Sequence, residues 1–238
     1  MDKYCNIHNI EMEEIATVGD VKITACPKCA EEKKAEEKAK NIQLKNERLS
    51  EAYGKVIPPK FINDDFTTYS LNGNGNQKAV YDLAVKFAKN PMAFSGLLLV
   101  GKHGTGKTHL AFSIIREVIS KGHTARYTEA IKIFRSIKES WHPTSAKLES
   151  EVLKGYKDPD VLVVDEIDVR YESKTETNIL TEIINDRVLI MKPTVLISNL
   201  SLSAVKDLIG ERAFDRFKDG GLGIACDWDS YRGSKGIV

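Results

Sequence analysis

The stretch LLLVGKHGTGKTHLAFSII, residues 97–115, decides the fold class of this chain. It opens on a continuous apolar run, which is typical of a short strand buried on both faces of a sheet. After a glycine-broken loop, apolar residues recur at helical spacing as far as Ile119, and Gly122 is placed to cap that helix. The loop fits G-x-x-x-x-G-K-[ST], the phosphate-binding P-loop, which requires a strand before it and a helix after it.

The P-loop predicts a site for a nucleoside triphosphate and Mg²⁺. Glycines let backbone N–H groups converge on phosphate oxygens, and the following helix points the positive end of its dipole at the anion. We expect Lys107 to reach the terminal phosphates and the Thr108 hydroxyl to bind Mg²⁺. The side chains of His103 and His109 are expected to pack locally or to face solvent. The residues predicted to hold the nucleotide are Gly101, Lys102, His103, Gly104, Thr105, Gly106, Lys107, Thr108 and His109.

The segment VLVVDEID, residues 161–168, places acids at the end of another buried strand. In an open α/β sheet, ligand chemistry lies at the carboxyl ends of the strands. We therefore expect Asp165 to hold Mg²⁺ and Glu166 to polarise the water that attacks the γ-phosphate. Asp168 is expected to face solvent or to cap the next turn.

Three further polar positions are candidates for the same site. Asn199 ends the apolar run VLIS and is placed either to orient the attacking water or to serve as an ordinary turn residue. Arg212 and Arg216 share one helix face in GERAFDRFKDG, as a charged surface or as an arginine finger offered to a neighbouring subunit. Arg232 in DWDSYR is placed to approach the nucleotide from the carboxyl side. Spacing alone does not decide these alternatives.

Composition restricts the class of protein. The chain has 238 residues, enough for one α/β domain and a small appendage, and a net charge of +1, so any nucleic-acid contact must be local. Lys132, Arg135 and Lys138 recur along one predicted helix, where we expect solvated side chains, with a phosphate-facing strip as the alternative. No apolar stretch is long enough to span a membrane, and the amino terminus lacks a signal-type apolar segment. We expect a cytoplasmic protein with no membrane partner.

A cysteine-histidine pattern near the amino terminus predicts a metal site. Cys5-x₂-His8 is followed, after 17 residues, by Cys26-x₂-Cys29, and each pair has the spacing that directs two ligands at one tetrahedral ion. So short a segment has no apolar core, so structural Zn²⁺ would supply its folding free energy. Unrelated thiols are the alternative. Cys226 stands apart and is expected to be a small buried hydrophobe.

The chain divides into three predicted regions: a zinc-binding module (1–30), a charged helical linker (31–55) and an ATPase domain (56–238). The linker begins EEKKAEEKAK and is expected to end near Gly54 and the Pro58-Pro59 pair, either as a plain connector or as a binding element. Beyond it, helices are predicted at 78–89, 129–140 and 175–191, and strands at 97–100 and 124–128 and within the apolar segments VLVVDEID (161–168) and PTVLISNL (193–200). Strands alternating with helices predict an α/β fold with a doubly wound parallel sheet.

Five segments together resemble the DnaC-type replicative helicase loaders, which are AAA+ ATPases. These segments are GKHGTGKTHLA, VLVVDEIDVRYESK, IINDRVLIMKPTVLISN, LIGERAFDRF and DWDSYR, between about residues 57 and 232. The resemblance implies an oligomeric protein that hydrolyses ATP between subunits, binds single-stranded DNA and places a DnaB-like hexameric helicase on it. It also implies that Lys107 and Thr108 belong to Walker A, Asp165 and Glu166 to Walker B, and Asn199 to the sensor position. Arg216 matches the trans-acting finger, Arg212 its companion and Arg232 the second sensor.

The amino terminus departs from the better-known loaders, which contact the helicase through a helical region, and is similar to phage or prophage variants. Two other hypotheses remain. An IstB-type transposition-helper ATPase has a similar core. A zinc adaptor would use ATP only as a structural ligand, although such a binder has no need of Glu166.

Overall fold

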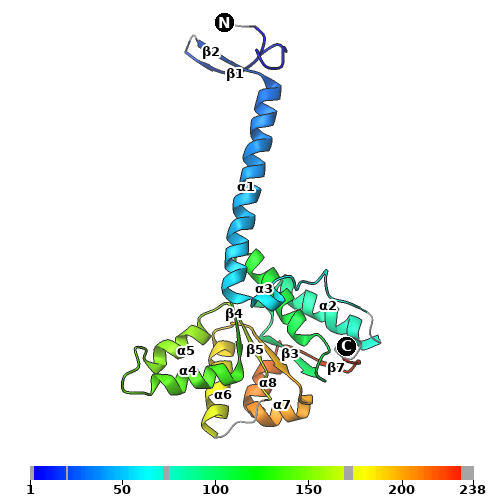
Figure 1. The fold of residues 1–238 in the computed structure, drawn as a ribbon, viewed down its shortest axis with the longest axis vertical. Helices are drawn as coiled ribbons and strands as arrows, with labels where there is room; N and C mark the ends of the chain where they lie inside the picture. Colours follow the sequence, from blue (N-terminus) through cyan, green and yellow to red (C-terminus); the bar gives the residue numbers. More distant parts are fainter. Residues whose placement is uncertain (1–2, 20, 72–74, 169–173, 232–238) are drawn as a thin grey trace, which may run out of the picture. The chain divides into compact units, whose positions relative to one another are not determined.

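The computed structural model describes residues 3–19, 21–71, 75–168 and 174–231. The chain divides into two compact units, Met1–Glu51 and Ala52–Val238, each of which is described by itself (Figure 1). Within the described residues, no helix is long and apolar enough to cross a membrane.

The first unit contains a hairpin and most of a long helix. Strands β1 (Glu13–Val18) and β2 (Val21–Ala25) pair antiparallel, with Val18 opposite Val21. Helix α1 (Pro27–Val56) starts with proline in its first turn, where the missing N–H costs nothing, and buries none of its residues. It runs through Gly54 and ends before the proline pair, because one glycine weakens a helix whereas proline removes a hydrogen bond.

The second unit is built on one parallel sheet of five strands in the order β4-β5-β6-β3-β7. The strands are β3 (Gly96–Gly101), β4 (Ala125–Glu129), β5 (Val161–Asp165), β6 (Thr194–Ser198) and β7 (Leu222–Cys226). The helices are α2 (Gly75–Lys89), α3 (Lys107–Ser120), α4 (Ala130–Ser140), α5 (Glu149–Lys157), α6 (Lys174–Leu189), α7 (Leu202–Ile209) and α8 (Glu211–Lys218), with short 3-10 turns at Pro59–Phe61 and Pro91–Ala93. Helices α2 and α3 lie on one side of the sheet and α4 to α8 on the other (Figure 1).

Alternation along the strands explains this layering. Leu98 and Val100 of β3 pack into the cluster that holds α4 to α8. Leu97 and Leu99 point to the opposite face, and both are fully buried. Gly101 closes the strand with φ +128°, and an added Cβ would lie 2.1 Å from the Cys226 carbonyl oxygen, so only glycine fits between β3 and β7 there.

A buried arginine ties together the amino ends of the central strands. Arg187 of α6 has no exposed surface, and its guanidinium donates to the Thr194 hydroxyl (2.9 Å) and to the carbonyls of Lys157 (2.9 Å), Pro159 (2.8 Å) and Pro193 (2.8 Å). Burial lowers the pKa of Arg187 to about 10, which still leaves it charged at neutral pH. These bonds satisfy a group that would otherwise be costly to bury.

The doubly wound parallel α/β fold is confirmed. The sequence did not predict α5, which has few apolar residues, the short helix α7, or the short strand β7, which carries a glycine. The strand predicted at 124–128 spans Ala125–Glu129, and the helix predicted at 175–191 spans Lys174–Leu189.

Candidate nucleotide-binding site and metal centre

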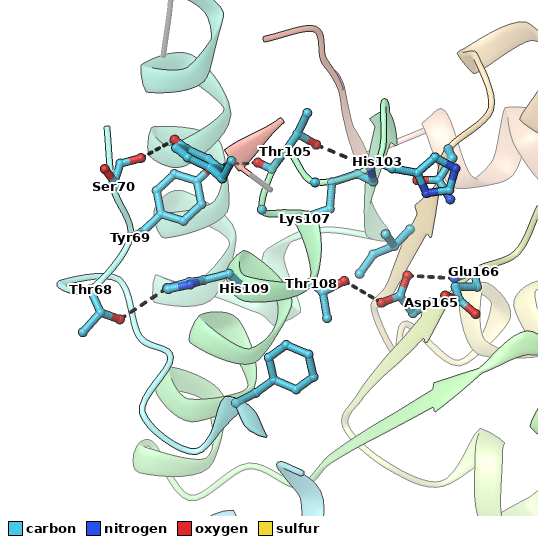
Figure 2. Close-up of a pocket in the computed structure, with 16 residues that line it drawn as sticks. Thr68, Tyr69, Ser70, His103, Thr105, Lys107, Thr108, His109, Asp165 and Glu166 are labelled. Atoms are coloured by element: carbon cyan, nitrogen blue, oxygen red, sulfur yellow. Dashed lines mark hydrogen bonds between the residues drawn. The ribbon is translucent and has the colours of Figure 1, made fainter. Parts of the chain in front are cut away.

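The carboxyl ends of the parallel strands meet at one edge of the sheet, where the structure has a cleft of about 530 Å³. The P-loop follows β3, the acids follow β5, and Asn199 follows β6. The cleft is lined by residues from all three, together with Phe61, Tyr69 and Tyr231. Figure 2 shows Asp165 and Glu166 on one side of Thr108 and the segment that carries Tyr69 on the other. The structure therefore brings together residues that are far apart in the sequence.

The P-loop is curled by glycines in the left-handed region, Gly104 with φ 77° and Gly106 with φ 86°. Lys107 is 6% exposed, and its ammonium donates to the carbonyls of Gly101 (2.6 Å) and Lys102 (2.7 Å). Helix α3 begins at Lys107, so its unpaired N–H groups face the loop. A cation and a helix amino terminus at one place make an anion site.

Asp165 and Thr108 form an oxygen-rich pair at the base of the cleft. The Thr108 hydroxyl donates to Asp165 Oδ2 (2.9 Å), and the Glu166 N–H donates to Asp165 Oδ1 (2.8 Å). Burial raises the pKa of Asp165, and the hydrogen bonds from Thr108, Glu166 and Tyr127 oppose that rise. Carboxylate and hydroxyl oxygens beside a phosphate site are ligands that suit Mg²⁺.

Tyr127 is a site residue that sequence reasoning missed. Its hydroxyl, on β4, donates to Asp165 Oδ2 (3.0 Å), and burial raises the pKa of Tyr127, so it remains a neutral donor. The sequence indicates this contact only weakly, because β4 can be placed beside β5 only once the order of strands in the sheet is known.

Glu166 has a strained backbone. Its φ of 54° is uncommon for a residue with a side chain, and such strain clusters at functional sites. Burial raises the pKa of its carboxyl, and the charges of Asp165, Glu129 and Asp168 raise it further. Glu129 is close because it lies opposite Asp165 in the register of β4 and β5. A carboxylate of raised basicity is suited to accept a proton from water.

Asp168 contacts the carboxyl end of β6. Its carboxylate accepts hydrogen bonds from the Asn199 N–H (3.1 Å), the Asn199 side-chain amide (3.0 Å) and the Ser198 hydroxyl (3.3 Å). Asp168 is only partly exposed to solvent, because the chain leaving β5 runs beside the end of β6, and the turn that it was expected to cap lies outside the described residues. These donors lower the pKa of Asp168 despite its partial burial, so it is a charged anchor for Asn199.

Two of the candidate arginines, Arg212 and Arg216, do not line the cleft. Arg212 and Arg216 are exposed on α8, and neither is among the described residues that line the cleft. The Arg216 guanidinium donates to Asn185 Oδ1 (3.3 Å), and Glu211 pairs with Lys206 (2.6 Å). Arg232 lies outside the described residues.

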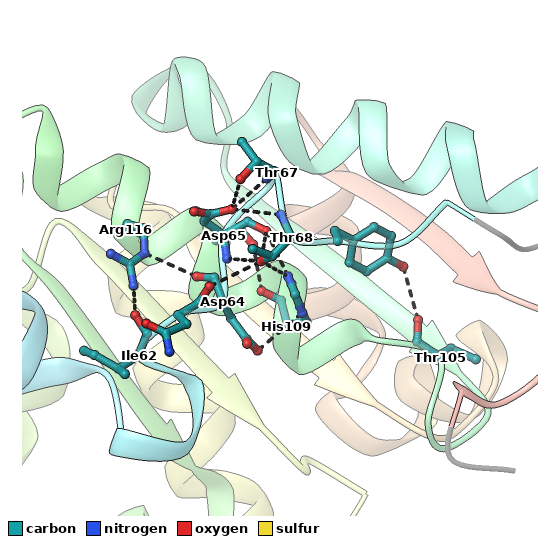
Figure 3. Close-up of polar contacts among 11 residues, drawn as sticks. Ile62, Asp64, Asp65, Thr67, Thr68, Thr105, His109 and Arg116 are labelled. Carbon is teal, nitrogen blue, oxygen red and sulfur yellow. Dashed lines mark hydrogen bonds and ion pairs between the residues drawn. The ribbon is translucent and has the colours of Figure 1, made fainter. Parts of the chain in front are cut away.

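His109 packs against the segment that precedes α2, and Figure 3 shows this contact. One ring nitrogen, Nε2, lies 2.9 Å from the Asp65 carbonyl oxygen, and the other, Nδ1, lies 3.3 Å from Asp64 Oδ2. Arg116, two turns along α3, donates to the carbonyls of Ile62 and Asp64. The local packing expected of His109 is therefore seen, and both His103 and His109 line the cleft.

The basic strip on α4 carries paired side chains. Lys132 lies 2.8 Å from Glu129, and Lys138 lies 2.7 Å from Glu176. Arg135 is exposed.

The four predicted metal ligands meet at one point in the first unit. The Cys29 and Cys26 sulfurs lie 3.3 and 3.6 Å from His8 Nδ1, and the Cys5 and Cys29 sulfurs lie 3.6 Å apart. A tetrahedron with zinc–sulfur and zinc–nitrogen bonds has edges of about 3.5–3.8 Å, so this donor set fits Zn²⁺. Cys29 is held by the first turn of α1.

A second layer of contacts supports this cluster. His8 Nε2 lies 3.0 Å from Glu32 Oε1, which leaves Nδ1 directed at the thiols, as is usual for a metal-binding histidine. Hydrogen bonds from the backbone of His8 and Ile7 lower the pKa of Cys5 to about 6. Cys226 has no part in the cluster; it is 1% exposed, and burial raises its pKa to about 12.

Comparison with known proteins gives the family. The model of the family described as IstB-like ATP binding protein matches residues 32–219. A replicative helicase loader DnaC of Buchnera aphidicola (subsp. Baizongia pistaciae) is 32% identical over 197 residues, and that of Escherichia coli K12 is 30% identical over 193. Each alignment covers 81% of this chain and 78% of the relative.

Solved structures show the same fold. A DnaC helicase loader matches with a TM-score of 0.62 at 20% identity, covering 72% of this chain and 100% of that one. AMPPCP-bound DnaA from Aquifex aeolicus matches with a TM-score of 0.60 at 20% identity over 71% of this chain, which spans only 50% of that protein. The second unit has the fold of an AAA+ domain, and the chain belongs to the IstB/DnaC-like ATP-binding family.

Proposed function

We propose that the chain is an ATP-hydrolysing replication protein that binds single-stranded DNA and loads a DnaB-like replicative helicase onto it. The observation that carries the proposal is the 2.9 Å contact between the Thr108 hydroxyl and Asp165, with Glu166 next to it in the same cleft as the P-loop. The relatives named replicative helicase loader DnaC support the choice of helicase as partner.

The roles of the site residues follow from their positions. Backbone N–H groups of the P-loop and the Lys107 ammonium bind the phosphates of ATP, and Thr108 and Asp165 hold Mg²⁺, which neutralises phosphate charge when bound. The Glu166 carboxylate takes a proton from the attacking water. Asn199, held by Asp168, orients that water or contacts the γ-phosphate.

Hydrolysis is proposed to occur between subunits. Arg216 and Arg212 are exposed on α8 and do not line their own chain's cleft among the described residues, as a finger offered to a neighbour requires. A guanidinium brought in from outside stabilises the charge that develops on the transferred phosphoryl group. We assign Arg232 to the second sensor from the family resemblance alone.

The remaining regions are assigned supporting roles. We propose that Cys5, His8, Cys26 and Cys29 bind one structural Zn²⁺, whose four protein ligands leave no position for catalysis. We also propose that the chain consists of a zinc module (1–30), a charged helical linker (31–55) and an ATPase domain (56–238). We propose a cytoplasmic location.

The test is a substitution that separates binding from chemistry. Glu166→Gln should reduce ATP hydrolysis by about 10²–10⁴-fold, because the base is lost, while ATP affinity stays within about twofold. Steady-state hydrolysis and equilibrium titration of ATP measure the two effects. Glu117→Gln is the matched control, since Glu117 pairs with Lys121 (3.0 Å) on the surface of α3. Full hydrolysis by Glu166→Gln would contradict the assigned role.

A transposition-helper ATPase is the alternative, because the matching family model is described as IstB-like. The two functions differ in partner. We expect the purified chain, with ATP and single-stranded DNA, to form a complex with the replicative helicase of its own host. A complex with a transposase and none with that helicase would eliminate the loader.

A further inference from the structure

The outward-facing carbonyls of the P-loop are held by donors from two distant parts of the chain. The Thr105 carbonyl accepts hydrogen bonds from the Tyr69 hydroxyl (3.2 Å) and the Trp228 indole N–H (3.1 Å). The Gly104 carbonyl accepts one from the Tyr231 backbone N–H (3.0 Å). Figure 2 shows Tyr69 and Thr105 at this contact, beside the loop. Tyr69 precedes α2, whereas Trp228 and Tyr231 follow β7.

The geometry of the peptide bond gives these contacts a consequence. A trans peptide is planar, so its C=O and its N–H point in opposite directions. Fixing the Thr105 carbonyl outward therefore directs the Gly106 N–H inward, and fixing the Gly104 carbonyl directs the Thr105 N–H inward. In a P-loop, the N–H groups that point inward are the ones that bind the phosphate oxygens.

The loop needs such restraint because of its glycines. Gly104 and Gly106 have φ 77° and 86°, and glycine adopts other backbone conformations at little cost, so the peptides that flank them are free to rotate in the absence of contacts. Donors outside the loop remove this freedom before any ligand arrives. Preorganisation of this kind raises affinity without adding a contact to the ligand.

The donors are themselves rigid. Thr105 is fully buried, Trp228 is 1% exposed and Tyr69 is 7% exposed. The Tyr69 ring stacks on Tyr81 with centroids 5.8 Å apart, and a Cβ on Gly106 would lie 2.8 Å from the Tyr69 ring. The backbone before Tyr69 is pinned to α3 by the His109 and Arg116 contacts (Figure 3).

We propose that Tyr69 and Trp228 are positioning residues for phosphate binding: their hydrogen bonds to the Thr105 carbonyl hold the Gly106 N–H toward the phosphates. The inference rests on the nucleotide-binding role proposed above and adds to it. It connects the segment before α2 and the segment after β7 to the phosphate site through one peptide group. Both residues act on the nucleotide through the loop.

The test uses a pair of matched substitutions and a ligand that lacks a base. Tyr69→Phe removes the hydroxyl that donates to the Thr105 carbonyl and that also hydrogen-bonds to the Gln77 side chain. Tyr81→Phe removes a hydroxyl from the adjacent stacked ring, where it donates to the Phe66 carbonyl (3.2 Å). Affinities for Mg²⁺-ATP and for Mg²⁺-tripolyphosphate are measured on the full chain by calorimetry, and thermal unfolding confirms that each variant is folded.

We expect Tyr69→Phe to weaken both ligands by the same factor, about 2- to 10-fold for one neutral hydrogen bond, and Tyr81→Phe to change neither. Trp228→Phe should act in the same direction. If Tyr69→Phe weakens ATP but not tripolyphosphate, the hydroxyl serves the nucleoside and the inference is overturned. Equal affinities of Tyr69→Phe and Tyr81→Phe for tripolyphosphate also overturn it. If the unmodified chain binds neither ligand, the proposed function fails instead.

Discussion

The two units of this chain are organised by different forces. In residues 52–238, many Val, Leu, Ile and Phe side chains of the sheet and helices are buried to 0–2% exposure, including Leu97, Leu99, Phe112 and Val163. Among the described residues before Ile57, the buried side chains are Cys5 (8%) and Cys26 (4%), and both are predicted metal ligands. The first unit thus has a ligand cluster where the second has an apolar core, and it has little apolar surface to bury without a metal.

Metal removal is expected to produce the largest difference in folding between the two units. Structural zinc in small domains contributes about 10–16 kcal/mol of apparent binding free energy, so a chelator or Cys29→Ser should unfold residues 3–26 and leave the sheet of residues 52–238 intact. Hydrogen exchange of the two regions and zinc analysis measure this effect. Cys226→Ser should keep one zinc per chain, because Cys226 is not in the cluster. Retained protection of the hairpin after chelation would show that its fold does not depend on metal.

The next largest effect is expected on ATP hydrolysis at the sites that the second units of neighbouring subunits would form. Arg216→Ala should lower ATP hydrolysis by about 10³–10⁵-fold, as loss of an arginine finger does, with ATP affinity and zinc content unchanged. Mixing two variants is the more specific measurement. Arg216→Ala keeps Glu166, and Glu166→Gln keeps Arg216, so mixed oligomers contain some complete sites between subunits. We expect activity to return on mixing; mixtures as inactive as their components would contradict a finger acting in trans.

A core substitution should affect only the second unit. Leu99 is fully buried at the centre of β3, and Leu99→Ala should lower the free energy of unfolding of residues 52–238 by about 2–5 kcal/mol through lost burial and a cavity. Chemical denaturation measures it. Leu44→Ala on α1, where Leu44 is 43% exposed, should change that free energy by less than about 0.5 kcal/mol. A drop in zinc content in Leu99→Ala would show that the two units are not independent.

The smallest effect concerns the acids of the cleft. Burial, Asp165, Glu129 and Asp168 all raise the pKa of Glu166. Glu166 acts as a base when ionised, so activity is lost as the pH falls through that pKa. Asp168→Asn removes one negative charge, and the acid limb of the hydrolysis profile should move to lower pH, with kcat a few-fold lower because Asn199 is less firmly held. Asp82→Asn, at a surface pair with Lys78, should leave the profile in place. An unmoved profile in Asp168→Asn would remove Asp168 from the site.

Much of the fold and of the candidate site could be predicted from contiguous patterns in the sequence. The strand-loop-helix around Lys107 and the apolar run before Asp165 each contain their own evidence, because the period of burial identifies the element and the motif identifies its end. The ligand pairs Cys5-x₂-His8 and Cys26-x₂-Cys29 are also local, since each pair is set by one turn of chain. Helix α5 has no such local signal, because its apolar side chains, Val152, Leu153 and Tyr156, are too few to show a period.

Tertiary structure alone decided which side chains from different elements meet. Tyr127 reaches Asp165 across 38 residues, Asn199 reaches Asp168 across 31, and Trp228 reaches Thr105 across 123. Each contact depends on the order and register of parallel strands, which are set by how the intervening helices pack on the sheet. A periodic sequence specifies the buried face of each element. Which element lies beside it, and hence which residues its polar ends contact, is determined only by the packing of the complete core.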